Sequence, residues 1–409
     1  MERIIMHIDA NNAFLSWTAV QMLKEGFKED IRKIPAIIGG DEDKRRGIVI
    51  AKSEPAKKYG IKTGEPIYFA KQKCPNLQIF KSDYKTYIKY SNLMIEIFKE
   101  YTQKIEKYSI DECFLDMTNE IPKGKTIEDI ANDISRTVKN RLGFTVNIGI
   151  SINKILAKMA SDLEKPDKIN TIYRNEIEKK MFPLPISELF GIGKKSAPKL
   201  KKLGLNTIGD IAKFNKNILE RKFGKFGKQI WEYSNGIDES KVIVESERPK
   251  GIGNSITLPV DYTNIEDLEE ILLSLAEEVS FRLRKKEMLT NCINIQLKTN
   301  EFKNYSHQRK ILKNTDSTKE IFNEGKILLN ELYNKLENKS IRLIGLRVDT
   351  KDENTEKQMS LFDIEEKEDK KQKSIDNVID NLKDKFGYDS VRRATSISKE
   401  NRINPKGFK

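Results

Sequence analysis

Three carboxylates stand where they could share a cation. The segment IEKYSIDECFLDM, residues 105–117, predicts a β-hairpin with Asp111 and Glu112 side by side at its turn. Asp9 ends RIIMHI, an apolar run with the character of a strand. Adjacent like charges on an apolar hairpin are costly unless a cation neutralises them, and a divalent metal ion is the usual one. Two plainer interpretations stay open, because acidic turns favour solubility and an aspartate can cap a following helix.

The composition narrows the possible partners. The 409 residues predict two to four domains, and 75 Lys and Arg against 62 Asp and Glu give a net charge of +13, which favours a polyanion such as nucleic acid. An anionic membrane surface would also fit the charge. No apolar run is long enough to span a membrane, and the N-terminus lacks the apolar core of a signal peptide, so we expect a cytoplasmic protein without a membrane partner.

The chain has too few cysteines and histidines for a disulfide framework, a zinc site or histidine-based catalysis. Cys74, Cys113 and Cys292 are far apart and odd in number, so we expect reduced packing residues. His7 and His307 are the only histidines, which disfavours zinc binding and histidine-based acid–base chemistry. Carboxylates and lysines must therefore carry any reaction.

The order of predicted elements gives the carboxylates a common location. A strand is followed by a helix, a compact basic β-rich insertion at 31–70, a helix at 86–103, the hairpin, another helix, the strand TVNIGIS and the helix NKILAKMASDLEK. This order contains the split βαβ layout of a ferredoxin-like sheet. If the first strand lies antiparallel beside the hairpin, Asp9, Asp111 and Glu112 converge on one face and can hold two Mg²⁺ ions.

A second pattern suggests contact with a phosphate backbone. Gly191 and Gly193 flank an isoleucine just before a helix, and Lys194 and Lys195 follow. The pattern is typical of a helix-hairpin-helix, in which glycines let backbone N–H groups approach a phosphate. The same turn can also be purely structural.

The C-terminal half contains another α+β unit and a charged tail. Residues 251–350 have their own apolar periodicity and predict a separate nucleic-acid-facing domain. Residues 351–373 are nearly all charged and are predicted not to fold, apart from the peptide QMSLF, whose apolar residues suit a partner's groove. Residues 374–396 predict a short amphipathic helix with a basic end.

Four stretches together resemble a known family. HIDANNAFLS, YSIDECFLD, NIGISINKILAKMASDLEKP and FGIGKKSAPKLKKLGL, in this order, resemble the Y-family translesion DNA polymerases of the bacterial polymerase IV and polymerase V types. The resemblance covers roughly residues 1–350. It implies an α+β multidomain fold, divided into a ferredoxin-like palm (1–11 and 80–173), small fingers (12–79), a helix-hairpin-helix thumb (174–240), a linker (241–250), an α+β little finger (251–350) and the tail (351–409).

The resemblance also implies roles for individual residues. It makes Asp9, Asp111 and Glu112 catalytic metal ligands, together with the Ala10 carbonyl, for two Mg²⁺ ions that Mn²⁺ can replace. The other implied roles are a steric gate against ribose at Phe14, triphosphate binding by Lys57 and Lys165, DNA binding by Gly191, Gly193, Lys194 and Lys195, and sliding-clamp binding by Gln358, Leu361 and Phe362 of QMSLF.

Three positions depart from the family pattern. Asn11 and Ala13 stand where the polymerase IV branch commonly has an aspartate and an aromatic residue, and neither is a metal ligand in the family. Glu54 stands where many relatives have a tyrosine on the triphosphate. Because an acid is unfavourable beside phosphates, we expect its side chain to point away.

The expected activity is low-fidelity, template-directed DNA synthesis across damaged templates by a monomer, with primer-template DNA, deoxynucleoside triphosphates and the sliding clamp as partners. An alternative is a catalytically silent, clamp-recruited DNA-binding scaffold of the same fold. A two-metal nuclease is a further alternative, disfavoured because nothing beyond the acidic triad suggests a group that activates water.

Overall fold

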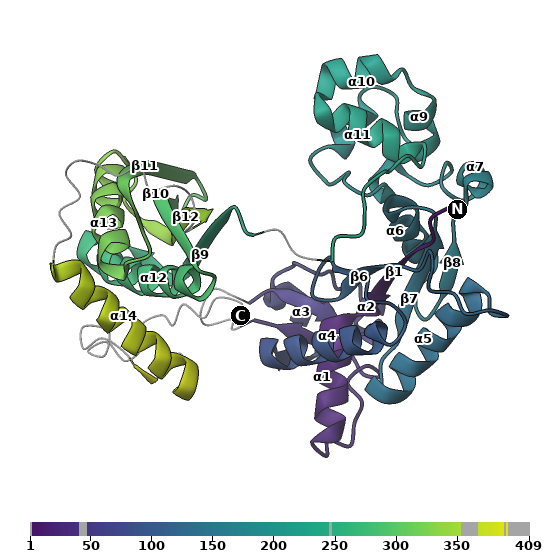
Figure 1. Ribbon diagram of the computed structural model, residues 1–409, viewed down its shortest axis with the longest axis horizontal. Coiled ribbons are helices and arrows are strands. Elements are labelled where there is room, and N and C mark those ends of the chain that lie inside the picture. Colours follow the sequence, from purple (N-terminus) through teal and green to yellow (C-terminus); the bar gives the residue numbers. More distant parts are fainter. Residues whose placement is uncertain (1, 41–46, 245–247, 353–366, 388–389, 392–409) are drawn as a thin grey trace. The chain divides into compact units, whose positions relative to one another are not determined.

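A computed structural model of the chain describes residues 2–40, 47–244, 248–352, 367–387 and 390–391. The chain divides into two compact units (Figure 1). Among the described residues, the first unit includes 2–40 and 48–244, and the second includes 248–352 and 367–387. Each unit encloses a large apolar core of its own.

A five-stranded sheet forms the centre of the first unit. Across the sheet the strands are β5 (Ile105–Lys107), β6 (Glu112–Asp116), β1 (Ile5–Ala10), β7 (Val146–Ser151) and β8 (Ile169–Thr171). β1 is antiparallel to both β6 and β7, and β8 is parallel to β7. The predicted ferredoxin-like order is thus confirmed, with the hairpin strand β6 directly beside β1. The short strand β8 was not predicted.

Helices cover both faces of this sheet. One face carries α1 (Ala13–Lys24), α4 (Tyr84–Lys99) and α5 (Ile127–Leu142), whose buried side chains join those of the strands in one core. α5 shows how local sequence sets these elements, because Thr126 forms a capping box at its start and Gly143 adopts a left-handed conformation at its end. The other face carries α6 (Lys154–Leu163), which Asn153 caps.

α6 lies very close to the sheet because β7 has a glycine beneath it. A Cβ atom on Gly149 would stand 2.0 Å from the carbonyl oxygen of Ala157 and 2.4 Å from the backbone nitrogen of Ser161. Any larger residue would push the helix away. The close approach places one face of α6 directly over β1.

The outer face of α6 belongs to a second core. Ile155, Leu156 and Met159 pack there against the helical segment at 174–234. The elements of that segment are the 3₁₀ turns η1 (Arg174–Glu176) and η2 (Ile186–Glu188) and the helices α7 (Ile177–Lys180), α8 (Ala197–Lys201), α9 (Ile208–Lys213), α10 (Lys216–Phe223) and α11 (Lys225–Ser234). α6 is therefore buried between the sheet and the helical segment.

The chain after α11 is fixed to the sheet for several residues. Arg3 donates hydrogen bonds to the carbonyl oxygens of Asp238 and Ser240, at 3.1 and 2.8 Å, and Glu106 accepts one from the backbone nitrogen of Ile243 at 2.8 Å. Val242 packs against apolar side chains of the sheet. The first residues of the stretch predicted as a polar linker therefore have defined contacts.

The predicted insertion is a small sheet with two helices. Its strands are β3 (Val49–Lys52), β2 (Ala36–Gly39) and β4 (Gln78–Lys81), with α2 (Glu54–Lys58) and α3 (Ile67–Lys73) packed on them. The sequence indicates strands at 34–40 and 47–53, which β2 and β3 match, whereas β4 was missed. β4 pairs parallel to β2.

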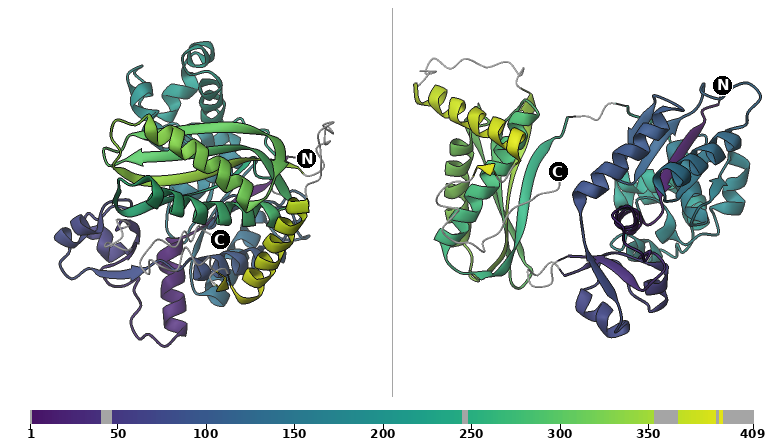
Figure 2. Two further views of the ribbon diagram at one scale, coloured as in Figure 1. Left: turned by 90° about the vertical axis from the view of Figure 1, so that its left-hand side faces the viewer. Right: turned by 90° about the horizontal axis from the view of Figure 1, so that it is seen from below.

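The second unit is a four-stranded antiparallel sheet with its helices gathered on one face (Figure 2). The strands across the sheet are β11 (Asn304–Thr315), β10 (Met288–Thr299), β12 (Ile341–Asp352) and β9 (Gly251–Tyr262), and the main helices are α12 (Ile265–Lys285) and α13 (Thr318–Asn334). The sequence indicates strands at 255–260, 291–299 and 341–348 and two helices between them, which β9, β10, β12, α12 and α13 match, but it gives no strand at β11. That edge strand is mostly polar and half exposed, so its sequence carries little apolar signal.

The last described helix, α14 (Lys367–Phe386), is attached to the second unit by ion pairs. The guanidinium of Arg284 contacts Asp380 at 2.6 Å and Asp376 at 3.5 Å, and Lys285 contacts Asp384 at 3.1 Å. The predicted amphipathic helix is therefore present, but its range was wrong. It begins at Lys367, within the stretch predicted not to fold, because charged residues can extend a helix that is anchored further along.

The described residues also bear on the predictions about membrane-spanning segments and cysteines. Of the helices that the structure describes, none is both long enough and apolar enough to cross a bilayer. Cys74, Cys113 and Cys292 are buried free thiols.

Candidate active site

The register of β1 and β6 brings the predicted carboxylates together. Asp9 pairs directly with Glu112, and the backbone nitrogen of Ala10 donates to the carbonyl oxygen of Asp111 at 3.0 Å. Side chains of β1 alternate between the two faces, so Met6 and Ile8 enter the large core while Asp9 faces α6. Four predicted site residues are thus adjacent at the ends of two neighbouring strands.

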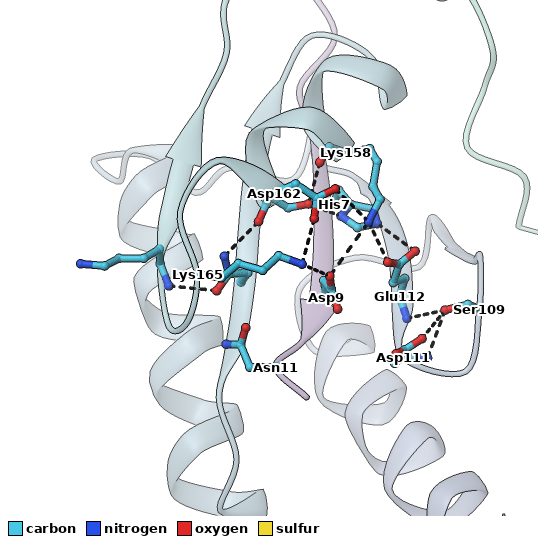
Figure 3. Close-up of polar contacts among 12 residues, drawn as sticks. His7, Asp9, Asn11, Ser109, Asp111, Glu112, Lys158, Asp162 and Lys165 are labelled. Atoms are coloured by element: carbon cyan, nitrogen blue, oxygen red, sulfur yellow. Dashed lines mark hydrogen bonds and ion pairs between the residues drawn. The ribbon is translucent and has the colours of Figure 1, made fainter. Parts of the chain in front are cut away.

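Lys158, on α6, and Lys165, just after it, neutralise Asp9 and Glu112 (Figure 3). Lys158 Nζ lies 2.7 Å from Glu112 Oε1 and 4.0 Å from Asp9 Oδ2. Lys165 Nζ lies 2.5 Å from Asp9 Oδ2. Both ammonium groups also contact Asp162, at 3.4 and 2.8 Å. The cluster therefore contains three carboxylates and two lysines.

The environment shifts the pKa values of the two facing carboxylates in opposite directions. Burial raises the pKa of Asp9 in spite of Lys165. Burial also acts to raise the pKa of Glu112, but His7 and Lys158 outweigh it and bring that pKa down to about 2. For Lys165, burial acts against the charge, yet Asp9 and Asp162 raise its pKa above the usual value. Glu112 and Lys165 are thus held in their ionised forms.

Asp111 makes a separate set of contacts. Its carboxylate accepts a hydrogen bond from Ser109 Oγ at 2.6 Å, and Ser109 Oγ accepts from the backbone nitrogens of Asp111 and Glu112, at 3.2 and 3.0 Å. In Figure 3 this side chain lies below Glu112, away from the lysines. Within the described part of the chain, no three His, Cys, Asp or Glu side chains are arranged to hold a metal ion.

His7 lies beneath the cluster although sequence reasoning gave it no role. Its Nδ1 lies 2.8 Å from Ser161 Oγ, and its Nε2 is 3.8 Å from Glu112 Oε2 and has no hydrogen-bond partner. Burial lowers the pKa of His7, so the ring is neutral at pH 7.

Phe14 lies near the start of α1 in a group of aromatic rings. Its ring centroid is 4.7 Å from that of Tyr87 and 6.2 Å from those of Trp17 and Tyr84. Tyr87 is in turn within 3.3 Å of the Thr18 hydroxyl. The half-buried Phe14 ring is therefore supported from several sides.

The other predicted substrate and DNA residues lie on separate elements. Lys57, on α2, is exposed and pairs with Glu54 at 3.5 Å. Gly191 has a φ of 91°, a conformation that glycine favours, and the carbonyl oxygen of Gly193 accepts from the backbone nitrogen of Ser196 at 3.1 Å. Lys194 and Lys195 follow and are exposed, and Gln358, Leu361 and Phe362 lie outside the described residues.

Family models match three parts of the chain. A model described as the impB/mucB/samB family matches residues 8–162, and that family's C-terminal domain matches 249–361. A model described as the thumb domain of DNA polymerase iota matches 187–238. The matched stretches cover most of the central sheet, most of the helical segment and the four-stranded sheet of the second unit.

Whole-chain comparisons agree with these matches. The DNA polymerase IV of Clostridium acetobutylicum is 45% identical over 98% of this chain and 100% of its own length. That of Acetivibrio thermocellus is 36% identical over 96% of this chain and 97% of its own. A solved Y-family DNA polymerase chimera of Dbh and Dpo4 has a TM-score of 0.74 at 25% identity, covering 85% of this chain and 98% of the chimera.

The ferredoxin-like sheet, the helical segment that matches a polymerase thumb domain and the DNA polymerase relatives together define a polymerase that copies a DNA template. On the sequence evidence the chain belongs to the Y family of translesion DNA polymerases. Enzymes of this family depend on divalent metal ions.

The donor set suits a hard divalent cation in its chemistry. Asp9 and Glu112 present carboxylate oxygens from adjacent strands, Ala10 follows Asp9, and Asp111 precedes Glu112. The lysines show that positive charge is already attracted to this place. Lys158, Asp162 and His7 were the neighbours that sequence reasoning missed. For Lys158 and Asp162 the available signal was their spacing of four residues within the predicted helix, which places them on one face.

The burial of Asp9 generates a stability prediction. Asp9→Asn should raise the melting temperature of the metal-free protein by a few degrees at pH 8, because the raised pKa makes the ionised carboxylate less favourable in the folded than in the unfolded chain. The difference should disappear as the pH falls below about 4, where Asp9 is protonated in both states. Calorimetry in chelator, from pH 3.5 to 8, measures it. An equal or lower melting temperature at pH 8 would contradict the prediction.

Proposed function

We propose that this Y-family polymerase extends a DNA primer at a two-cation site formed by Asp9, Asp111, Glu112 and the Ala10 carbonyl. The pairing of Asp9 with Glu112 across β1 and β6 carries the proposal, since it brings donors a hundred residues apart in sequence to one place. Mg²⁺ is the expected ion, with Mn²⁺ as a substitute, because the donors are all oxygen. Bound there, the ions would activate the primer 3′-hydroxyl and stabilise the leaving pyrophosphate.

The chain's own residues do the rest of the work. The primer 3′-oxygen bonds to the α-phosphorus of the incoming nucleotide while the bond to pyrophosphate breaks. Lys165 turns from Asp9 toward the triphosphate and Lys57 adds a second positive charge, while Asp162 keeps its contact with the cluster. No histidine is required to move a proton, in keeping with the neutral, buried His7.

The second part of the proposal concerns fidelity and recruitment. The fingers are a small three-stranded sheet with two short helices, so we expect a loosely enclosed base pair and low fidelity on damaged templates. Gly191, Gly193, Lys194 and Lys195 would contact the DNA backbone. We further propose that the enzyme is a monomer and acts on DNA in the cytoplasm.

The metal-ligand assignment predicts a separation of binding from chemistry. Asp111→Ala should bind primer-template DNA within about twofold of wild type but lose primer extension by roughly a thousandfold or more, because only the charged transition state needs this carboxylate. Gel extension and fluorescence anisotropy measure the two properties. Glu120→Gln, an acidic residue beyond the same strand, is the matched control and should extend normally. Extension by Asp111→Ala at a near-normal rate would remove this residue from the site.

The steric-gate assignment predicts a change in sugar selection. Phe14→Ala should raise the ratio of ribonucleotide to deoxynucleotide incorporation by roughly tenfold or more, because the ring no longer blocks a 2′-hydroxyl. Single-nucleotide insertion kinetics measure the ratio. Phe27→Ala, at an exposed phenylalanine just after α1, is the control. Because Phe14 also packs on Tyr87, Phe14→Leu provides a second variant with more of the original volume. An unchanged ratio in both variants would exclude the role.

The QMSLF peptide predicts clamp-dependent stimulation. Replacing Leu361 and Phe362 by alanine should leave extension of short primers unchanged and abolish stimulation by a loaded sliding clamp, because both apolar anchors of the peptide are lost. Ser360→Ala, within the same peptide, should keep the stimulation. If the clamp still stimulates the double variant, the peptide is not the recruiting element.

A further inference from the structure

Lys158 is an unusual lysine for its depth. Only 9% of its surface is exposed, yet its ammonium group touches Glu112, approaches Asp9 and contacts Asp162. A lysine so deeply buried is retained only when its charge is matched by acidic partners. Here those partners include the two carboxylates proposed to bind divalent cations.

The position of this ammonium group follows from the backbone. The missing side chain at Gly149 lets α6 approach the sheet, so that Lys158 extends across β1 to reach β6. Lys165 reaches Asp9 from just beyond the end of α6. Of the two lysines, Lys158 is the more enclosed, since its side chain is 11% exposed and that of Lys165 is 40% exposed. Lys165 is therefore the more open to solvent, while Lys158 can exchange partners only within the cluster.

Asp162 is an alternative ion-pair partner for Lys158. It lies one helical turn further along α6 and is 39% exposed, with Oδ2 already 3.4 Å from the Lys158 ammonium. A small rotation of the lysine side chain would exchange Glu112 for Asp162 as its main partner. The carboxylate of Glu112 would then be free for a metal ion.

We propose that Lys158 is a positioning residue that takes the place of a divalent cation in the metal-free enzyme, and that Asp162 receives its ammonium group when the cation binds. The inference rests on the proposed metal site. Lys158 offsets the repulsion between Asp9 and Glu112. Its presence lowers the affinity of the site for a metal ion, because the incoming cation must displace the ammonium group.

Binding of Mn²⁺ alone to the full-length protein, without DNA or nucleotide, tests the proposal by electron paramagnetic resonance. Lys158→Met should bind Mn²⁺ about tenfold or more tightly than wild type, comparable to the effect of one adjacent charge on a carboxylate's proton affinity. Lys158→Arg should bind like wild type, and Asp162→Asn should bind several-fold more weakly. Lys154→Met removes another half-buried lysine of α6, which pairs with Glu106, and should not change the affinity.

Each result decides something. If Lys158→Met binds Mn²⁺ no more tightly than wild type, the proposal is overturned, and the same holds if neither protein binds Mn²⁺. Binding of Mn²⁺ by Lys158→Met but not by wild type supports the proposal. If Lys158→Met does not fold, an unchanged affinity in Asp162→Asn overturns it. Mn²⁺ binding that survives Asp9→Asn and Glu112→Gln would instead refute the metal site itself, so the two failures are distinguishable.

Discussion

The pairing of β1 with β6 is the constraint on which the site depends. Asp9 and Glu112 face each other only in the observed register. A shift of one residue would turn His7 and Asp9 into the large core and expose Met6 and Ile8 to α6. The apolar faces of the two strands thus fix the position of the acidic groups. Burial of those faces sets the strand register through the hydrophobic effect, and the register sets where the carboxylates lie.

The site is arranged for function at some cost to stability. Burial raises the pKa of Asp9, which means that the charged carboxylate is tolerated and not favoured in the metal-free fold. Glu112 differs because its side chain is less buried and because His7 and Lys158 together lower its pKa. The pKa values of two carboxylates on neighbouring strands are therefore shifted in opposite directions. A bound cation would stabilise the ionised form of both.

The sequence allowed the central sheet and the meeting of its carboxylates to be predicted, because strand periodicity and the hairpin leave few possible topologies. It did not reveal β11, whose polar residues at a sheet edge lack an apolar pattern. Nor did it reveal the contacts of Lys158 and His7. Those contacts depend on how closely α6 approaches the sheet at Gly149, a distance that periodicity does not encode. The start of α14 was misplaced because its first turns are charged and have no apolar stripe.

α6 connects the carboxylate cluster at the central sheet with the core of the helical segment. Its inner face carries Lys158 and its outer face carries Met159, which packs into the core of the helical segment. α6 therefore contacts the carboxylate cluster on one face and the helical segment on the other. Because Lys158 and Met159 are consecutive residues of one helix, a displacement of the helical segment that moved α6 would also change the distance from the Lys158 ammonium group to Glu112.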